Sequence, residues 1–122
     1  IKKISTALCE GGILLFSLEH PSVTANKGKE SWVTNEEGNL LHFAVDNYQE
    51  EGLRTQNWLV DNVVMYHRTM STIINTLIEN GLQIEKVIEP IPTEEALRNL
   101  PNLNKELRRP SFLIVRAKKY DF

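Results

Sequence analysis

The stretch that decides the fold is HRTMSTIINTLIENGLQIEKVIEP, residues 67–90. Its first part predicts a helix over 69–80, because apolar residues recur there at i, i+3, i+4, i+7 and i+8 and so share one helical face. Gly81 stands where a left-handed residue ends such a helix. Residues 82–88 predict a short strand, which Pro90 ends. A helix followed at once by a strand is half of a βαβ unit.

Two further strands are predicted from continuous apolar runs. ILLFSL at 13–18 and SFLIVRA at 111–117 are typical of strands that are covered on both faces. Residues 1–9 predict the last turns of a helix, and Gly11-Gly12 would end it. The chain therefore predicts an α/β fold with three strands.

The order of the strands follows from their connections and composition. Strands 13–18 and 82–88 are joined by a helix, so we expect them to be parallel, with a right-handed crossover. Strand 111–117 is then expected between them and antiparallel to both, with the more polar strand 82–88 at an edge.

Strand 13–18 has nothing in this sequence to lie on its other side, and a bare apolar edge favours aggregation. We expect a missing N-terminal half, a second copy of the chain or another subunit to cover it. The first residue is Ile1 rather than methionine, which indicates a cut, a processing point or an engineered start.

The remaining segments are predicted to elaborate this sheet. Residues 22–31 suggest a mobile polar loop, and Glu37-Gly38-Asn39 predicts the turn of a hairpin. Residues 55–65 predict a further strand, and Thr93 is expected to cap a short helix that ends at Asn99. We interpret the chain as a single partial domain made of a helix end and strand (1–21), an insertion or lid (22–65), a helix and strand (66–90), a long loop (91–110) and a last strand with its tail (111–122).

The composition is that of an ordinary soluble domain: 122 residues, 41% hydrophobic and 25% charged. The net charge of −2 predicts no binding to nucleic acid or to anionic membranes. No apolar run is long enough to span a bilayer, and no signal peptide is visible. A single cysteine, Cys9, cannot form an internal disulfide, which fits the cytoplasm.

Three segments, GGILLFSLEHP (11–21), YHRTMSTIINTLIENGLQIEKVIEP (66–90) and RRPSFLIVRAKK (108–119), resemble the C-terminal half of class I S-adenosylmethionine-dependent methyltransferases, in particular the small-molecule type 11 group. In that family a helix ending in Gly-Gly leads into strand five. A helix and strand six follow, and the antiparallel strand seven inserts between five and six. The resemblance implies a Rossmann-like methyltransferase sheet with strand order 5-7-6, a lid-like β insertion, S-adenosylmethionine as cofactor and a small-molecule methyl acceptor.

The sequence departs from that family at the cofactor site. Doubly wound α/β folds bind cofactors with a Gly-rich loop that follows a strand. The one glycine pair here, Gly11-Gly12, precedes a strand instead. The cofactor-binding elements are therefore expected upstream of Ile1, so this chain alone is expected to hold no cofactor-binding residues and to be inactive.

Four residues are predicted to bind substrate. His20 follows strand 13–18 at its carboxyl end, where it could act as a hydrogen-bond partner or general base, or only start a His-Pro loop. Tyr66, His67 and Arg68 precede the helix near the same face of the sheet. Arg68 could pair with a substrate carboxylate or phosphate, or with a carboxylate of the chain, namely Asp61 or Glu89. His67 could accept a proton or orient a substrate hydroxyl, or cap local backbone.

Other groups give weaker signals. Glu89 is either a rim acid of the site or an exposed strand-end carboxylate. The aromatic residues of the insertion either wall a pocket or form its own small core; these are Trp32, Phe43, Tyr48 and Trp58. The three histidines match no metal-binding spacing, so no metal is predicted. The alternative to a methyltransferase portion is a non-enzymatic module that forms a homodimer through strand 13–18.

Overall fold

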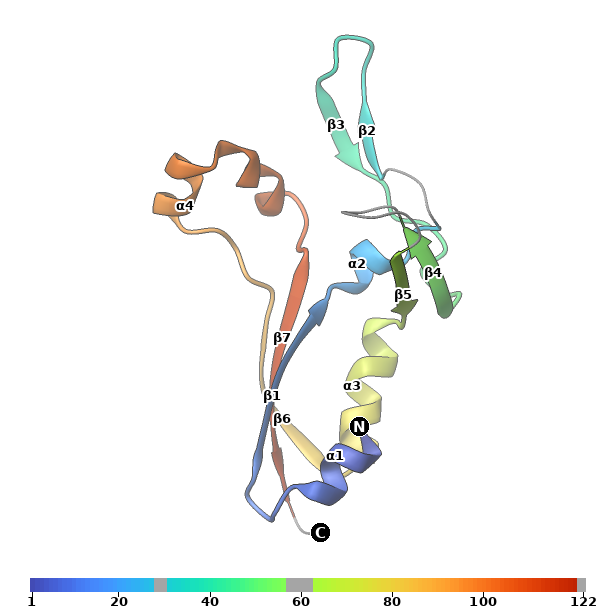
Figure 1. Cartoon of the computed structure of the whole chain (residues 1–122), viewed down its shortest axis with the longest axis vertical. Helices are drawn as coiled ribbons and strands as arrows, with labels where there is room; N and C mark the ends of the chain where they lie inside the picture. Colours follow the sequence, from blue (N-terminus) through green and yellow to red (C-terminus); the bar gives the residue numbers. More distant parts are fainter. Residues whose placement is uncertain (28–30, 57–62, 121–122) are drawn as a thin grey trace.

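The computed structural model describes residues 1–27, 31–56 and 63–120. Its centre is a sheet of three strands in the order β1 (Ile13–Glu19), β7 (Phe112–Lys119) and β6 (Leu82–Ile88) (Figure 1). β7 is antiparallel to both neighbours, so β1 and β6 are parallel to each other. This order agrees with the arrangement expected from the apolar pattern.

The helix α3 (Met70–Glu79) links β5 (Val63–His67) to β6 and matches the helix predicted over 69–80. It begins where Thr69 accepts a hydrogen bond from the Thr72 amide through its side-chain oxygen, at 3.2 Å. It ends before Gly81, whose φ of 77° lies in the left-handed region that glycine tolerates best. Local sequence thus fixes both ends of this helix.

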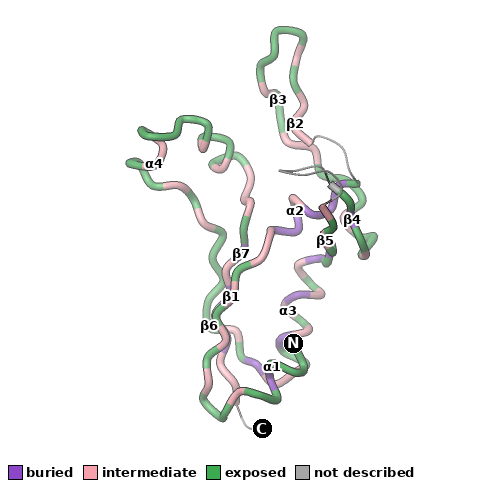
Figure 2. Tube along the Cα trace, viewed as in Figure 1, coloured by how far each residue is buried: buried purple, intermediate pink, exposed green. Residues whose placement is uncertain are grey.

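The apolar core lies on one face of the sheet, which α3 and the short α1 (Lys2–Ala7) cover (Figures 1 and 2). Side chains at alternate positions of β7 point into it and meet the inner side of α3. Lys119 links α1 to the end of the sheet, because its ammonium group donates a hydrogen bond to the Leu8 carbonyl at 2.7 Å. The buried core residues are Ile73, Leu77, Leu82, Leu113, Val115 and Ala117.

The opposite face of the sheet is open. Along β1 the side chains alternate between partly buried and exposed, and Leu15 is 64% exposed. Phe112 on β7 is 54% exposed. The prediction that strands 13–18 and 111–117 are covered on both faces is therefore wrong for the described residues, because the described helices that pack on the sheet lie on one side only. The outer edge of β1 also pairs with no described strand.

The insertion after β1 begins with a helical turn, α2 (Pro21–Thr24), where the sequence suggested a loop. His20 caps this turn and Pro21 supplies a first-turn residue with a fixed φ, so a helix starts despite the polar composition. Thr24, Ala25 and Asn26 are buried. The prediction of a loop is therefore wrong for residues 22–24, which are helical, while residues 25–27 form no helix or strand and residues 28–30 lie outside the described part.

Two small antiparallel pairs follow. The hairpin predicted around residues 37–39 is confirmed: β2 (Trp32–Thr34) pairs with β3 (Leu40–Phe43). The single strand predicted at 55–65 is instead divided, because Thr55 belongs to β4 (Gly52–Gln56) and Met65 to β5, which pair with each other. Residues 57–62 lie outside the described part.

The connection from β6 to β7 carries α4 (Glu94–Asn99), which the Thr93 side chain caps at 3.1 Å as predicted. A 3-10 helix follows, η1 (Pro101–Leu107), which the sequence analysis did not predict. Figure 1 shows that this connection and the β2–β3 hairpin both lie beyond the same end of the sheet.

We expect Leu77→Ala to lower the free energy of unfolding by about 2–5 kcal/mol, because a fully buried leucine of the core loses its packing and leaves a cavity. Denaturant unfolding measures the change. Ile78→Ala on the same helix is the control, since Ile78 is 56% exposed and its loss should have a much smaller effect. Equal destabilisation by the two variants would contradict this packing.

Candidate functional site

The candidate site lies where the parallel strands β1 and β6 end. In open α/β sheets ligands bind outside the carboxyl ends of the strands. His20 follows β1 and Glu89 follows β6, while Ser111 precedes β7 between them. The His20 amide donates to the Ser111 carbonyl at 2.9 Å, which closes the edge of the sheet. Two long segments therefore leave the sheet at this edge: the insertion that follows β1 and the connection from β6 to β7.

Both ring nitrogens of His20 are engaged by the protein. Nδ1 accepts a hydrogen bond from the Ser22 amide at 3.0 Å, and this is the cap of α2. Nε2 contacts a carboxylate oxygen of Glu89. A nitrogen that accepts an N–H carries no proton, so in the neutral ring the proton lies on Nε2 and is donated to Glu89. The structure therefore brings His20 and Glu89 together, although they lie 69 residues apart in the sequence.

His67 is fully buried and faces the interior of the insertion. Its Nε2 lies 2.8 Å from the Tyr48 carbonyl, which can only accept, so Nε2 donates. Nδ1 then accepts from the Thr24 hydroxyl at 2.7 Å. The Tyr48 ring meets the imidazole edge-on with centroids 5.5 Å apart. His67 thus joins α2, the loop that contains Tyr48 and β5, with both ring nitrogens used.

Tyr66 and Arg68 are exposed and form a second pair. The Arg68 guanidinium carbon lies 4.2 Å from the centroid of the Tyr66 ring, a cation–π distance. Arg68 does not pair with Glu89, which binds His20 instead, and Asp61 lies outside the described residues. Arg68 also borders a cavity of about 340 Å³ between β1 and α3. The other residues that line this cavity are Ile1, Phe16, Leu18, Ile73, Thr76 and Leu77.

The start of α3 is held by the insertion. A Glu51 carboxylate oxygen accepts from the Thr69 amide at 3.0 Å, and the Tyr48 hydroxyl accepts from the Met70 amide at 2.9 Å. The Thr69 amide hydrogen bond lowers the pKa of the Glu51 carboxyl, with a further contribution from the Thr72 side chain. The amides of Thr69, Met70 and Thr72 are therefore satisfied by protein groups.

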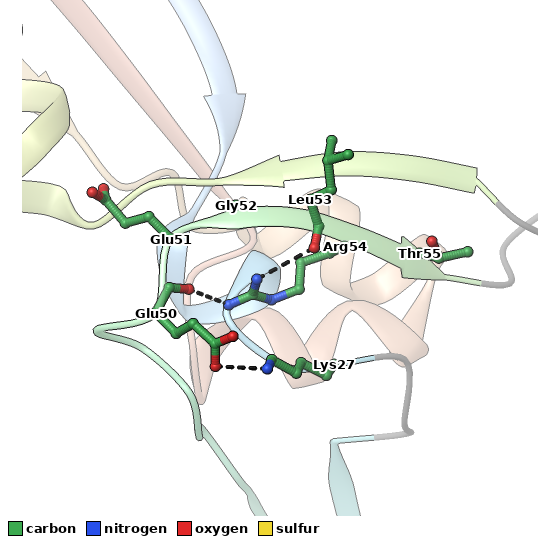
Figure 3. A pocket seen from close by; sticks show the side chains of 7 residues that line it. All are labelled: Lys27, Glu50, Glu51, Gly52, Leu53, Arg54 and Thr55. Carbon is green, nitrogen blue, oxygen red and sulfur yellow. Dashed lines mark hydrogen bonds and ion pairs between the residues drawn. The ribbon is translucent and has the colours of Figure 1, made fainter.

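Arg54 organises the insertion from within, and sequence reasoning missed it. Its side chain is buried, with the residue only 4% exposed, and its nitrogens donate to main-chain carbonyls, including that of Ala25 at 2.8 Å. Beside it lies a cavity of about 460 Å³ (Figure 3). The ion pair Lys27–Glu50, at 2.6 Å, borders this cavity and holds the pKa of the Glu50 carboxyl below its usual value. Because main-chain oxygens occupy Arg54, we assign it a structural role.

The insertion and the β6–β7 connection contact each other beyond the carboxyl ends of β1 and β6. Trp32 and Phe43 pack edge-on across the hairpin, with centroids 5.1 Å apart, and Arg109 lies 4.6 Å from the Phe43 centroid. Arg108 donates to the Leu41 carbonyl at 2.8 Å. The aromatic residues therefore serve packing within the insertion and its docking, and Trp58 lies outside the described residues.

Within the described residues, no group of three or more His, Cys, Asp or Glu side chains is placed to hold a metal ion. Within the same part of the chain, no helix combines the length and apolar character needed to cross a membrane.

Comparison with known proteins shows what the chain resembles. A candidate S-adenosylmethionine-dependent methyltransferase of Listeria monocytogenes is 46% identical with a TM-score of 0.88, over 98% of this chain and 53% of that protein. An S-adenosylmethionine-dependent methyltransferase of Mesorhizobium loti is 39% identical with a TM-score of 0.83, over 97% and 53%. An uncharacterized protein of Haemophilus influenzae is 35% identical over 99% of this chain and 47% of its own length. No family model matches the chain.

The chain therefore has the fold of a part of these methyltransferase structures, and it spans about half the length of the relatives that it matches. The similarity covers nearly the whole chain, so it includes the insertion as well as the sheet.

We expect Glu51→Gln to lower the stability of the protein at pH 7, because the amide is a weaker acceptor for the Thr69 N–H than the carboxylate. The folded pKa of Glu51 is lowered, so its contribution is present above the unfolded value of 4.5 and is lost as pH falls through the folded pKa. Thermal unfolding from pH 7 to pH 3 should show the difference between variant and wild type shrink. Glu37→Gln, in an exposed turn, is the control. A difference that does not shrink as the pH falls over this range would contradict the assignment.

Proposed function

We propose that this chain is the C-terminal, substrate-side portion of an S-adenosylmethionine-dependent methyltransferase that acts on a small molecule. The observation that carries the proposal is the match to two methyltransferase structures at 46% and 39% identity. The order β1-β7-β6, with β7 antiparallel, supports a correspondence with strands 5-7-6 of the type 11 group.

The described residues suit the acceptor side of such an enzyme and not its cofactor side. S-adenosylmethionine supplies an electrophilic methyl group, and the protein must position the acceptor and, where necessary, remove its proton. Gly11 and Gly12 precede β1, at the end of that strand opposite His20, and no described strand is followed by a glycine-rich loop and a helix. We therefore assign no cofactor-binding residue to this chain and propose that it is inactive alone.

We propose that Tyr66 and Arg68 face the acceptor. Both are exposed, and Arg68 stands at the border of the largely apolar cavity between β1 and α3, where it could pair with a carboxylate or phosphate of the acceptor. His67 belongs to the same proposed site as a positioning residue, because its buried ring fixes β5 just before Arg68. His20 lies at the carboxyl edge of the sheet.

We also propose that the insertion from residue 22 to residue 65 is a lid over the acceptor. Its support is the place of the β2–β3 hairpin beyond the carboxyl edge, where Arg108 and Arg109 contact it. Loops that carry function commonly stand on a rigid sheet in this way.

Isothermal titration calorimetry tests the proposed function. We expect the full-length protein to bind S-adenosylmethionine and the 122-residue chain not to bind it, because the cofactor-binding elements lie outside this chain. The absence of binding to the full-length protein would contradict the proposed function. Binding to the 122-residue chain alone would contradict our division of the site.

A second candidate function is self-association of the chain through β1. The observation that favours it is the unpaired outer edge of β1 beside an exposed apolar face that includes Leu15 and Phe112. Such an edge can pair with the same strand of a second copy.

Multi-angle light scattering tests this candidate. We expect the 122-residue chain to be a dimer, and we expect Leu15→Glu to shift it toward monomer because a carboxylate would be buried in the interface. Leu53→Glu is the control, since Leu53 is 70% exposed on β4, away from the sheet. A wild-type chain that is monomeric at all concentrations would exclude self-association.

A further inference from the structure

We propose that Glu89 is the carboxylate that accepts the proton of the methyl acceptor, and that His20 is the positioning residue that holds it. This inference rests on the proposed function. It starts from the edge of the sheet at which β1 and β6 both end, the edge at which open α/β folds bind ligands.

His20 is poorly placed to act on an acceptor itself. Its Nδ1 is occupied by the Ser22 amide and its Nε2 by Glu89, and the side chain is only 11% exposed. A substrate would have to displace one of these partners to reach the ring. The Glu89 side chain is 52% exposed, so the accessible member of the pair is the carboxylate.

One oxygen of the Glu89 carboxylate is held by His20, and the other is available to a substrate. Oε2 contacts His20 Nε2, and Oε1 has no hydrogen-bond partner among the described residues. A free glutamate side chain samples many rotamers, and its ordering costs free energy. The histidine has already ordered it, and preorganised groups of this kind assist catalysis because they need not reorganise during the reaction.

The end of β1 is also joined to the chain that leads into β7. The His20 amide already bonds the Ser111 carbonyl, and the Ser22 hydroxyl bonds the Pro110 carbonyl at 3.1 Å. These contacts join the end of β1 to the start of β7 without any charged side chain. The contact of His20 with Glu89 adds a link from the end of β1 to the end of β6.

The partner of Glu89 also distinguishes it from two other carboxylates, those of Glu85 and Glu106. Glu85 faces the guanidinium of Arg116 at 3.0 Å, and Glu106 faces that of Arg109 at 3.2 Å. Glu89 instead contacts Nε2 of the His20 imidazole, which orients the carboxylate. Such a carboxylate can take up a proton, as a general base must.

Proton transfer to Glu89 indicates the class of methyl acceptor. As the acceptor oxygen or nitrogen forms its bond to the methyl group and the bond from that methyl to the sulfonium sulfur breaks, the proton of the acceptor hydroxyl or amine passes to Oε1 of Glu89 and S-adenosylhomocysteine is released. The carboxylic acid then returns the proton to water. An acceptor atom without a proton, such as a thioether sulfur, would gain nothing from this base. The acceptor is therefore a group that loses a proton from the accepting atom, as an alcohol, a phenol or an amine does.

The test uses the full-length protein and a panel of small phenols, alcohols and primary amines, with release of S-adenosylhomocysteine as the measure of methyl transfer. We expect Glu89→Gln to lower kcat about 100-fold, with binding of S-adenosylmethionine unchanged by calorimetry. Glu85→Gln is the matched control on the same strand and should keep wild-type kcat.

Two substitutions of His20 separate positioning from helix capping. His20→Asn keeps a good cap for α2 but cannot reach Glu89, and we expect it to lower kcat about tenfold because the carboxylate is no longer held in place. His20→Gln weakens the cap but keeps an N–H that can reach Glu89, and it should retain more activity than His20→Asn. A role in capping alone predicts the reverse order.

A readout independent of activity comes from ¹⁵N NMR of histidine-labelled full-length protein. We expect His20 at neutral pH to carry its proton on Nε2. The opposite tautomer, wild-type kcat in Glu89→Gln, the reverse order of the two His20 variants, or no methylation of any panel member by a protein that binds S-adenosylmethionine would each overturn the inference. Failure to bind S-adenosylmethionine at all would instead overturn the proposed function on which it rests.

Discussion

The structure depends on the hydrogen-bond ladders that β7 makes on both of its sides. They place Leu113, Val115 and Ala117 at the centre of the core, against α3. They also make β1 and β6 parallel through a shared antiparallel neighbour, so both strands end at one edge of the sheet. The proposed acceptor side follows from that edge, because the insertion and the β6–β7 connection both leave the sheet there.

The sheet and the insertion are stabilised in different ways. The sheet buries apolar side chains against helices, as ordinary domains do. The insertion instead buries polar groups, chiefly Arg54 and His67, whose hydrogen bonds go to main-chain carbonyls and to the Thr24 hydroxyl. Buried polar groups that are fully hydrogen-bonded fix the conformation of loops that have few apolar residues to pack. Hydrogen bonds of buried polar side chains therefore stabilise the conformation of the proposed lid.

Periodicity in the sequence predicted the elements whose signals are local: α3 with its cap and its glycine, the three strands of the sheet, and the β2–β3 hairpin. It missed the turn of α2 and the division of β4 from β5, because polar composition hides a capped helix and spacing alone does not show where a strand turns back. The site residues were harder, since the pair His20–Glu89 joins positions 69 residues apart. The resemblance placed His20 at the site, but only the contacts show that Glu89 is its accessible partner. The apolar runs, finally, do not tell which face of the sheet the helices of this chain cover.

The central claim is that this chain supplies the acceptor side of a methyltransferase whose cofactor side lies elsewhere. A crystal structure of the full-length protein with S-adenosylhomocysteine tests it most directly. We expect the ligand to contact residues outside this chain, with its sulfur directed toward the carboxyl edge at which His20 and Glu89 lie, and a further strand to pair with the free edge of β1. A ligand bound at the opposite end of the sheet, near Gly11 and Gly12, would contradict the account.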